Sequence, residues 1–217
     1  MFKKKEYVII ALSIVLMTLM LSFQKARLYN EYFFKYFIIS VIILTVFLFA
    51  KILVAYRLDS KIEIKLWQLK RYWVTKKSYL EKPIPIGILL PLLLSFLSYG
   101  AIKFLAFITF EIEARPSKVA KRYGFYRYQD VTDWDYALIS FYSLVALMLL
   151  AIICSILTPY LPASLYLKEI SRLSLYFTIS NILPLGQLDG LRIFFGSRPL
   201  YVFSLILLVI TGLIVFL

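Results

Sequence analysis

Histidine is absent from this 217-residue chain, and cysteine occurs once, at Cys154. The lack of histidine removes the usual zinc ligand, the commonest general base and the side chain that titrates near neutral pH. A single thiol can form neither an intramolecular disulfide nor a thiolate metal cluster, and in its apolar surroundings we expect it to be a small buried side chain. The sequence therefore predicts a protein without a bound metal or other cofactor.

Charged residues are also scarce. They make up 17% of the chain, apolar residues make up 62%, and the mean hydropathy is +0.83. Soluble domains carry about 25% charged and about 45–50% apolar residues, so we expect this chain to lie in a bilayer. Acidic residues number only 12 against 25 basic ones, which gives a net charge of +13. Basic residues beside membrane spans normally mark the cytoplasmic side, so this charge does not require a nucleic acid partner.

Six apolar stretches are long enough to be considered as membrane segments. A spanning helix needs about 20 apolar residues, and the stretch 84–99 is shorter and contains Pro85, Gly87 and Pro91. We interpret it as re-entrant or interfacial, the alternative being a sixth span. The remaining five stretches are interpreted as spans: 7–23, 32–56, 136–159, 173–185 and 200–217.

The distribution of basic residues favours one topology. If 84–99 does not cross, 19 basic residues lie on the side of the N-terminus and four on the other side. The positive-inside rule then places the N-terminus in the cytoplasm. We therefore predict a multi-pass protein of the cell membrane, with residues 84–135 on the cytoplasmic side and the C-terminus outside.

Two segments between the apolar stretches have the alternation of half-buried strands. Residues 61–66 alternate strictly between charged and apolar side chains, and residues 101–113 alternate more loosely. We expect a small β element at the cytoplasmic edge of an otherwise all-α polytopic membrane protein. No internal repeat or linker divides the chain, so we predict one integral membrane domain, with 1–31 as an N-terminal span and loop and 32–217 as the core.

A polar motif precedes the last apolar stretch. Asn181, Pro184, Leu188, Asp189 and Gly190 follow the pattern Asn-x-x-Pro-x-x-x-Leu-Asp-Gly. A proline in a membrane helix frees a backbone carbonyl that a nearby asparagine can satisfy, and an aspartate at membrane depth is costly and usually functional. The motif resembles that of the site-2 proteases, which are intramembrane zinc peptidases, and its place before the last span is similar to that in the small archaeal members. The alternative is a structural kink with an interfacial aspartate.

The resemblance implies a zinc site that this chain cannot complete. In the family the aspartate is one zinc ligand, and a His-Glu-x-x-His helix supplies two more. Residues 55–57 and 63–67 resemble the segments that follow this helix in the small archaeal members. Counting back from them puts the two histidine positions at Phe47 and Lys51 and the catalytic glutamate at Leu48.

A rival register starts from residues 119–124, which also resemble the end of that helix. It puts the histidine positions at Ile112 and Pro116 and retains a glutamate, Glu113. We prefer the first register because a proline disfavours a helix interior. In either register the histidines are missing, so the resemblance implies a site-2-protease-like core in a degenerate member of the family.

Lys51 lies within an apolar stretch, and two interpretations are open. Its ammonium snorkels to the cytoplasmic interface, or it stands in the vestigial metal site and neutralises Asp189. An unpaired carboxylate at this depth costs several kcal/mol, which makes a lysine partner physically reasonable. In the second case we expect the two charges within about 4 Å, the usual limit of an ion pair.

We therefore expect a non-catalytic membrane protein that binds another membrane segment, as a scaffold subunit or regulator of a membrane complex. Its partners would be the lipid bilayer and other membrane protein subunits. The alternative is a membrane-embedded protease with a divergent site, metal-dependent or built from Asp189 with Glu111 or Glu113. Transport is a third class, but it needs several intramembrane polar groups along a path, and few are present.

Overall fold

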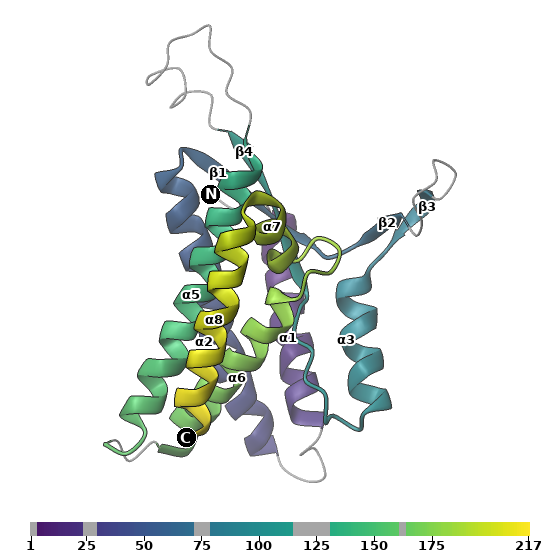
Figure 1. Ribbon diagram of the computed structural model, residues 1–217. Coiled ribbons are helices and arrows are strands. Elements are labelled where there is room, and N and C mark those ends of the chain that lie inside the picture. Colours follow the sequence, from purple (N-terminus) through teal and green to yellow (C-terminus); the bar gives the residue numbers. More distant parts are fainter. Residues whose placement is uncertain (1–3, 24–29, 72–78, 115–130, 161–163) are drawn as a thin grey trace, which may run out of the picture.

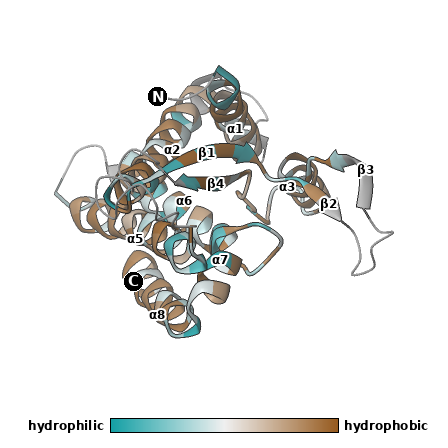
Figure 2. Ribbon diagram, turned by 90° about the horizontal axis from the view of Figure 1, so that it is seen from above, coloured by the Kyte–Doolittle hydropathy of each residue, from teal (hydrophilic) through white to brown (hydrophobic). Residues whose placement is uncertain are grey.

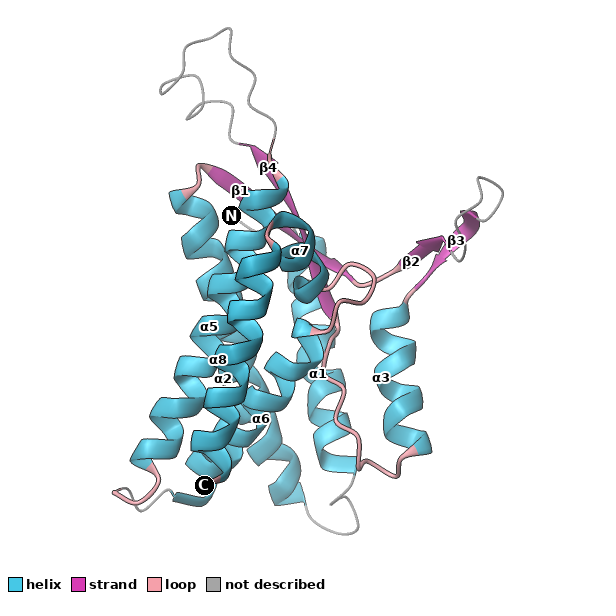
Figure 3. Cartoon of the chain, in the orientation of Figure 1, coloured by secondary structure: helices cyan, strands magenta, loops and turns pink. Residues whose placement is uncertain are grey.

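The computed structural model describes residues 4–23, 30–71, 79–114, 131–160 and 164–217 (Figure 1). Most of these residues are helical, and the strands lie at one end of the helices (Figure 3). The helices are α1 (Lys4–Phe23), α2 (Asn30–Arg57), α3 (Ile86–Leu97), α5 (Asp133–Leu157), α6 (Ser164–Ile182), α7 (Asp189–Gly196) and α8 (Arg198–Phe216). The strands are β1 (Ser60–Leu66), β2 (Leu69–Arg71), β3 (Tyr79–Ile84) and β4 (Ile108–Ala114).

Four of the described helices, α1, α2, α5 and α8, are long and apolar enough to cross a membrane. This agrees with a membrane protein, but it corrects the expected count of five apolar spans. The stretch 173–185 is the second half of α6, and the first half carries Lys168, Glu169 and Arg172, which lower the mean hydropathy of the helix. The long helices run from one end of the bundle to the other, and the start of α1 and the end of α8 lie at opposite ends (Figure 1).

Helix α6 is nevertheless an internal element of the bundle. It packs mainly against α5, and Leu173, Leu175 and Phe177 are buried. Its buried face also carries hydroxyl groups, among them Ser174 and Thr178, and the Thr178 hydroxyl donates to a carbonyl of its own helix at 2.8 Å. A helix enclosed by others needs less apolar surface than one that faces lipid, which explains why a hydropathy criterion does not select α6.

The segment that contains α3 leaves and returns at the same end of the bundle, as expected for a re-entrant element. From β3, α3 runs toward the opposite end, and an extended segment brings the chain back to β4 (Figure 1). Non-helical backbone at membrane depth is stable only where protein satisfies it. Here Leu105 N donates to Ser180 Oγ at 2.9 Å, Trp67 N donates to Phe107 O at 3.0 Å, and residues 104–107 are buried.

The predicted β element is present and is formed by β1 and β4. They pair antiparallel, from Ser60 opposite Ala114 to Leu66 opposite Ile108. The second strand is shorter than the predicted 101–113, because residues 101–107 form the returning segment instead. Seen from the strand end, β1 and β4 lie between helices α1 and α2 on one side and α7 on the other (Figure 2). A second hairpin, β2–β3, was not predicted.

Candidate functional site

The centre of the site is an ion pair between α2 and α7. Lys51 lies near the end of α2, and Asp189 is the first residue of α7. Lys51 Nζ is 2.8 Å from both Asp189 Oδ1 and Oδ2, and each side chain is only 3% exposed. The two charges therefore have the contact expected from the sequence, and the snorkelling interpretation of Lys51 is wrong.

Aromatic rings enclose the ammonium of Lys51. Its Nζ lies 4.2 Å from the ring centroid of Phe47 and 4.0 Å from that of Phe110. Both distances suit cation–π attraction, which is strengthened when the cation is desolvated. The Ser140 hydroxyl donates to Asp189 Oδ1 at 3.2 Å, so the carboxylate has a second donor. The pair is thus a charge-neutral unit whose polar atoms are satisfied by protein.

The positions of the preferred register converge on Asp189. Phe47 and Lys51 are four residues apart and therefore lie on one face of α2, and this face meets the N-terminal end of α7. Leu48, at the glutamate position, is also buried. The fold thus brings together the three positions that the resemblance assigns to two histidine ligands and one aspartate ligand.

The rival register does not fit the structure. Ile112 and Glu113 lie on strand β4 and not on a helix, while Pro116 is outside the described residues. Glu111, the other carboxylate considered for a divergent protease, forms an ion pair with Lys65 across the β1–β4 sheet. This hydrogen bond with Glu111 raises the pKa of the Lys65 ammonium. Neither glutamate is therefore placed as a helical partner of Asp189.

Two residues of the motif have structural roles that differ from the alternative of a structural kink. Helix α6 ends at Ile182, so Pro184 lies in the exposed loop that follows and does not interrupt a helix. The Asn181 amide is buried and donates to Phe177 O at 2.8 Å, within the last turns of α6. The alternative interpretation of the motif as a structural proline kink is therefore wrong, because the helix stops before the proline.

The last part of the motif fixes the position of α7. Leu188 is buried against Trp67 and Phe104. A Cβ on Gly190 would lie 1.8 Å from Ile182 O, so only glycine allows α7 to begin this close to the end of α6. The glycine thereby holds Asp189 in the position where Lys51 reaches it.

Arg192 belongs to the site but was not singled out from the sequence. It lies three residues after Asp189 on α7, and its Nη2 donates to Thr109 Oγ1 at 3.0 Å. Its Cζ is 4.0 Å from the ring centroid of Phe110 and 5.0 Å from that of Tyr136. Burial lowers the pKa of the guanidinium, which still carries its charge at neutral pH. The i, i+3 spacing from Asp189 was the signal that could have found it.

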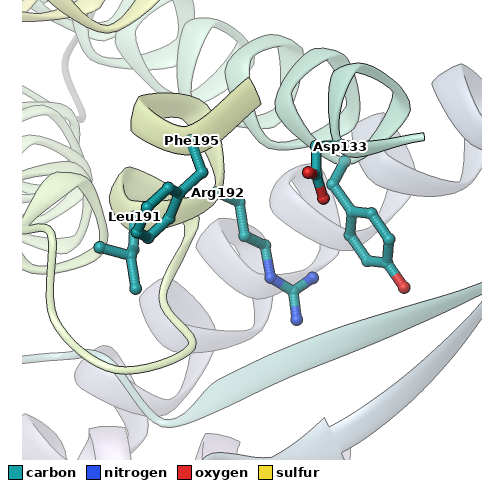
Figure 4. A pocket seen from close by; sticks show the side chains of 5 residues that line it. Asp133, Leu191, Arg192 and Phe195 are labelled. Carbon is teal, nitrogen blue, oxygen red and sulfur yellow. The ribbon is translucent and has the colours of Figure 1, made fainter. Parts of the chain in front are cut away.

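A cavity of about 310 Å³ adjoins this arginine. Figure 4 shows Arg192, Leu191 and Phe195 extending from α7 and Asp133 from α5. Tyr136 completes the lining, and its hydroxyl accepts a hydrogen bond from Ile112 N of β4 at 3.1 Å. The cavity therefore lies between the first turn of α5 and helix α7, where Tyr136 of α5 contacts β4.

Over the described part of the chain, no group of three or more histidine, cysteine, aspartate or glutamate side chains is placed to hold a metal ion. A comparison with protein-family models, with curated proteins and with solved structures finds no match for this chain. The resemblance to site-2 proteases is thus an inference from the motif at 181–190 and from the proximity of Phe47, Lys51 and Asp189.

Proposed function

We propose that this chain is a non-catalytic membrane protein with a site-2-protease-like core, which serves as a binding subunit or regulator of a membrane complex. The observation that supports this most is the Lys51–Asp189 pair, in which an ammonium takes the place of the catalytic metal. The pair explains how a protease-like motif is retained in a chain without histidine.

The geometry opposes metal-dependent hydrolysis at this site. A catalytic zinc needs about three protein ligands and an open position for water. Asp189 contributes both oxygens to Lys51, and the aromatic rings of Phe47 and Phe110 flank the ammonium. The position of the general base is taken by Leu48, which cannot accept a proton. The Lys51 ammonium would repel a zinc ion, two ligands are missing and the general base is absent. All three features disfavour zinc-dependent hydrolysis.

The binding role is supported by the surface of α3. This helix buries Gly87, Pro91 and Ser95, and it packs Ile86, Leu90 and Leu94 against the cluster of Trp67, Phe104, Ala106 and Leu188. Other large apolar side chains of α3 are exposed, among them Leu93 and Phe96. Strand addition is less favoured, because Glu6 Oε1 accepts the hydrogen bond of Ile64 N on β1 and Tyr136 accepts that of Ile112 N on β4. The preferred partner is a transmembrane helix packed against α3.

The vestigial metal site is tested by restoring the ligands. In the double variant Phe47→His with Lys51→His, two imidazoles and Asp189 would face one another, and we expect about one zinc per chain after purification, as a three-ligand site requires. Zinc should also raise the melting temperature of this variant. The further change Asp189→Asn should weaken zinc binding, because it removes the charged ligand.

A matched control uses the next pair of positions on the same helix. Leu48→His with Ile52→His has the same i, i+4 spacing, but Ile52 is partly exposed and points away from Asp189 more than Lys51 does. We expect no zinc retention above wild type in this control. Equal zinc content in both double variants, or none in a monodisperse Phe47→His/Lys51→His protein, would overturn the vestigial-site assignment.

The partner is tested by crosslinking in native membranes. A photoreactive residue at Leu93 on α3 should give one discrete protein adduct that disappears when Phe96→Ala weakens the surface. The same residue at Ile210, on the exposed face of α8, should give mainly lipid adducts. Lipid adducts alone at both positions would contradict a helix partner on α3.

A further inference from the structure

Within the described part of the chain, one positive charge of the site is not paired with a carboxylate. Lys51, Asp189 and Arg192 together carry two positive charges and one negative charge, and both oxygens of Asp189 are bound by Lys51. Among the described residues Arg192 takes part in no ion pair, and its buried Nη1 has no hydrogen-bond acceptor. A buried charged donor without an acceptor is costly, so the arginine is poised to bind an anionic oxygen.

The cavity beside Arg192 has charges of both signs. Asp133 lines it from the first turn of α5 and is exposed, with no ion pair to the rest of the described chain. Figure 4 shows the Asp133 carboxylate extending from α5 and the Arg192 guanidinium extending from α7. The remaining lining from α7, Leu191 and Phe195, is apolar. A purely anionic ligand would be repelled by Asp133, whereas a ligand with a phosphate and an ammonium satisfies both side chains.

The cavity lies at the level where two membrane helices begin. The apolar spans of α5 and α8 start at Asp133 and Arg198, and both helices contact α7. Trp134, next to Asp133, is 48% exposed, as is typical of aromatic side chains at a membrane interface. Phosphate groups of lipids are concentrated at this depth. The volume of about 310 Å³ is at the low end for ligand pockets, which suits a headgroup better than a whole lipid.

We propose that this cavity binds the headgroup of a phosphoethanolamine lipid. The lipid phosphate accepts hydrogen bonds from the Arg192 guanidinium, whose planar arrangement of donors suits a phosphate. The lipid ammonium lies against the Asp133 carboxylate, and the glycerol and first acyl carbons contact Leu191 and Phe195. This site does not depend on the proposed non-catalytic function, since none of its residues belongs to the Lys51–Asp189 pair.

The test measures lipid binding by the purified full-length protein with native mass spectrometry. Titrations use phosphatidylethanolamine, phosphatidylcholine and phosphatidylglycerol of identical acyl chains. We expect phosphatidylethanolamine to bind at least tenfold more tightly than either of the others, because the trimethylated ammonium of phosphatidylcholine cannot donate hydrogen bonds. Equal affinities for the three lipids in the wild-type protein would overturn the proposal.

Three variants assign the contacts. Arg192→Gln should reduce phosphatidylethanolamine binding at least tenfold, while Arg198→Gln, an exposed arginine at the start of α8, should leave it unchanged. Asp133→Asn should remove the preference for phosphatidylethanolamine over phosphatidylglycerol. Asp133 lies outside the Thr132–Asp135 capping box of α5, so this variant keeps the helix start intact and tests the site even if Arg192→Gln does not fold. Unchanged lipid preference in Asp133→Asn would refute the ammonium contact.

Discussion

The Lys51–Asp189 pair can be measured by a double-mutant cycle of Lys51→Met and Asp189→Leu. Both side chains are 3% exposed, and the ammonium is 2.8 Å from each carboxylate oxygen. Removing one partner of a buried pair leaves an uncompensated charge and costs about 3–5 kcal/mol, whereas replacing both with apolar groups is often nearly neutral. We therefore expect each single variant to lose much more unfolding free energy than the double variant.

The two single variants should also differ from each other. Without Lys51, the Ser140 hydroxyl at 3.2 Å is the remaining side-chain hydrogen-bond donor to Asp189 among the described residues. Without Asp189, the ammonium still lies between the rings of Phe47 and Phe110, and each desolvated cation–π contact contributes about 1–2 kcal/mol. Lys51→Met should thus be the more destabilising of the two.

The assay is reversible unfolding in mixed micelles, followed by circular dichroism at several denaturant fractions. The matched control is the pair Lys35–Glu169, which has a similar distance of 3.0 Å but side chains that are 14% and 25% exposed. Its cycle should give a coupling of about 1 kcal/mol or less, as for partly solvated pairs. Additive effects of Lys51→Met and Asp189→Leu, with a coupling no larger than that of the control, would refute the reasoning.

Two further predictions concern the motif and the topology. Gly190→Ala should destabilise the protein by about 3 kcal/mol, the upper end for overpacking, because the new Cβ meets Ile182 O. Gly212→Ala in α8 should be neutral or stabilising, since its Cβ makes only an ordinary contact with Leu175. Thermal unfolding of both variants checks this prediction. The topology is tested by labelling intact cells with an impermeant thiol reagent, in a Cys154→Ala background. The cysteine of Lys61→Cys should resist the reagent, and the cysteine of Tyr160→Cys should react. The opposite pattern would reverse the predicted orientation.

The sequence by itself determined the elements whose signals are local. Long apolar runs predicted α1, α2, α5 and α8 as membrane helices, because lipid contact along a whole helix demands an apolar composition that is visible in sequence. The strict alternation of 61–66 predicted β1, and the proline-interrupted stretch 84–99 predicted a segment that returns to the side it came from. The motif at 181–190, together with the register counted back from Glu63 and Trp67, predicted the contact of Lys51 with Asp189.

Only the tertiary structure decided the features that depend on neighbours. The end of α6 at Ile182 and the start of α7 at Asp189 are set by the close approach of Gly190 to the Ile182 carbonyl, which no local pattern encodes. In the sequence, Arg192 is one of several basic residues near a membrane edge. Its role in the site depends on contacts with Thr109 and Phe110, which lie about 80 positions earlier in the chain. Phe110 and α7 pack against Lys51 and bury it, so that its ammonium forms an ion pair and does not snorkel. These contacts join distant segments, so their energies are set by packing and not by the composition of any one segment.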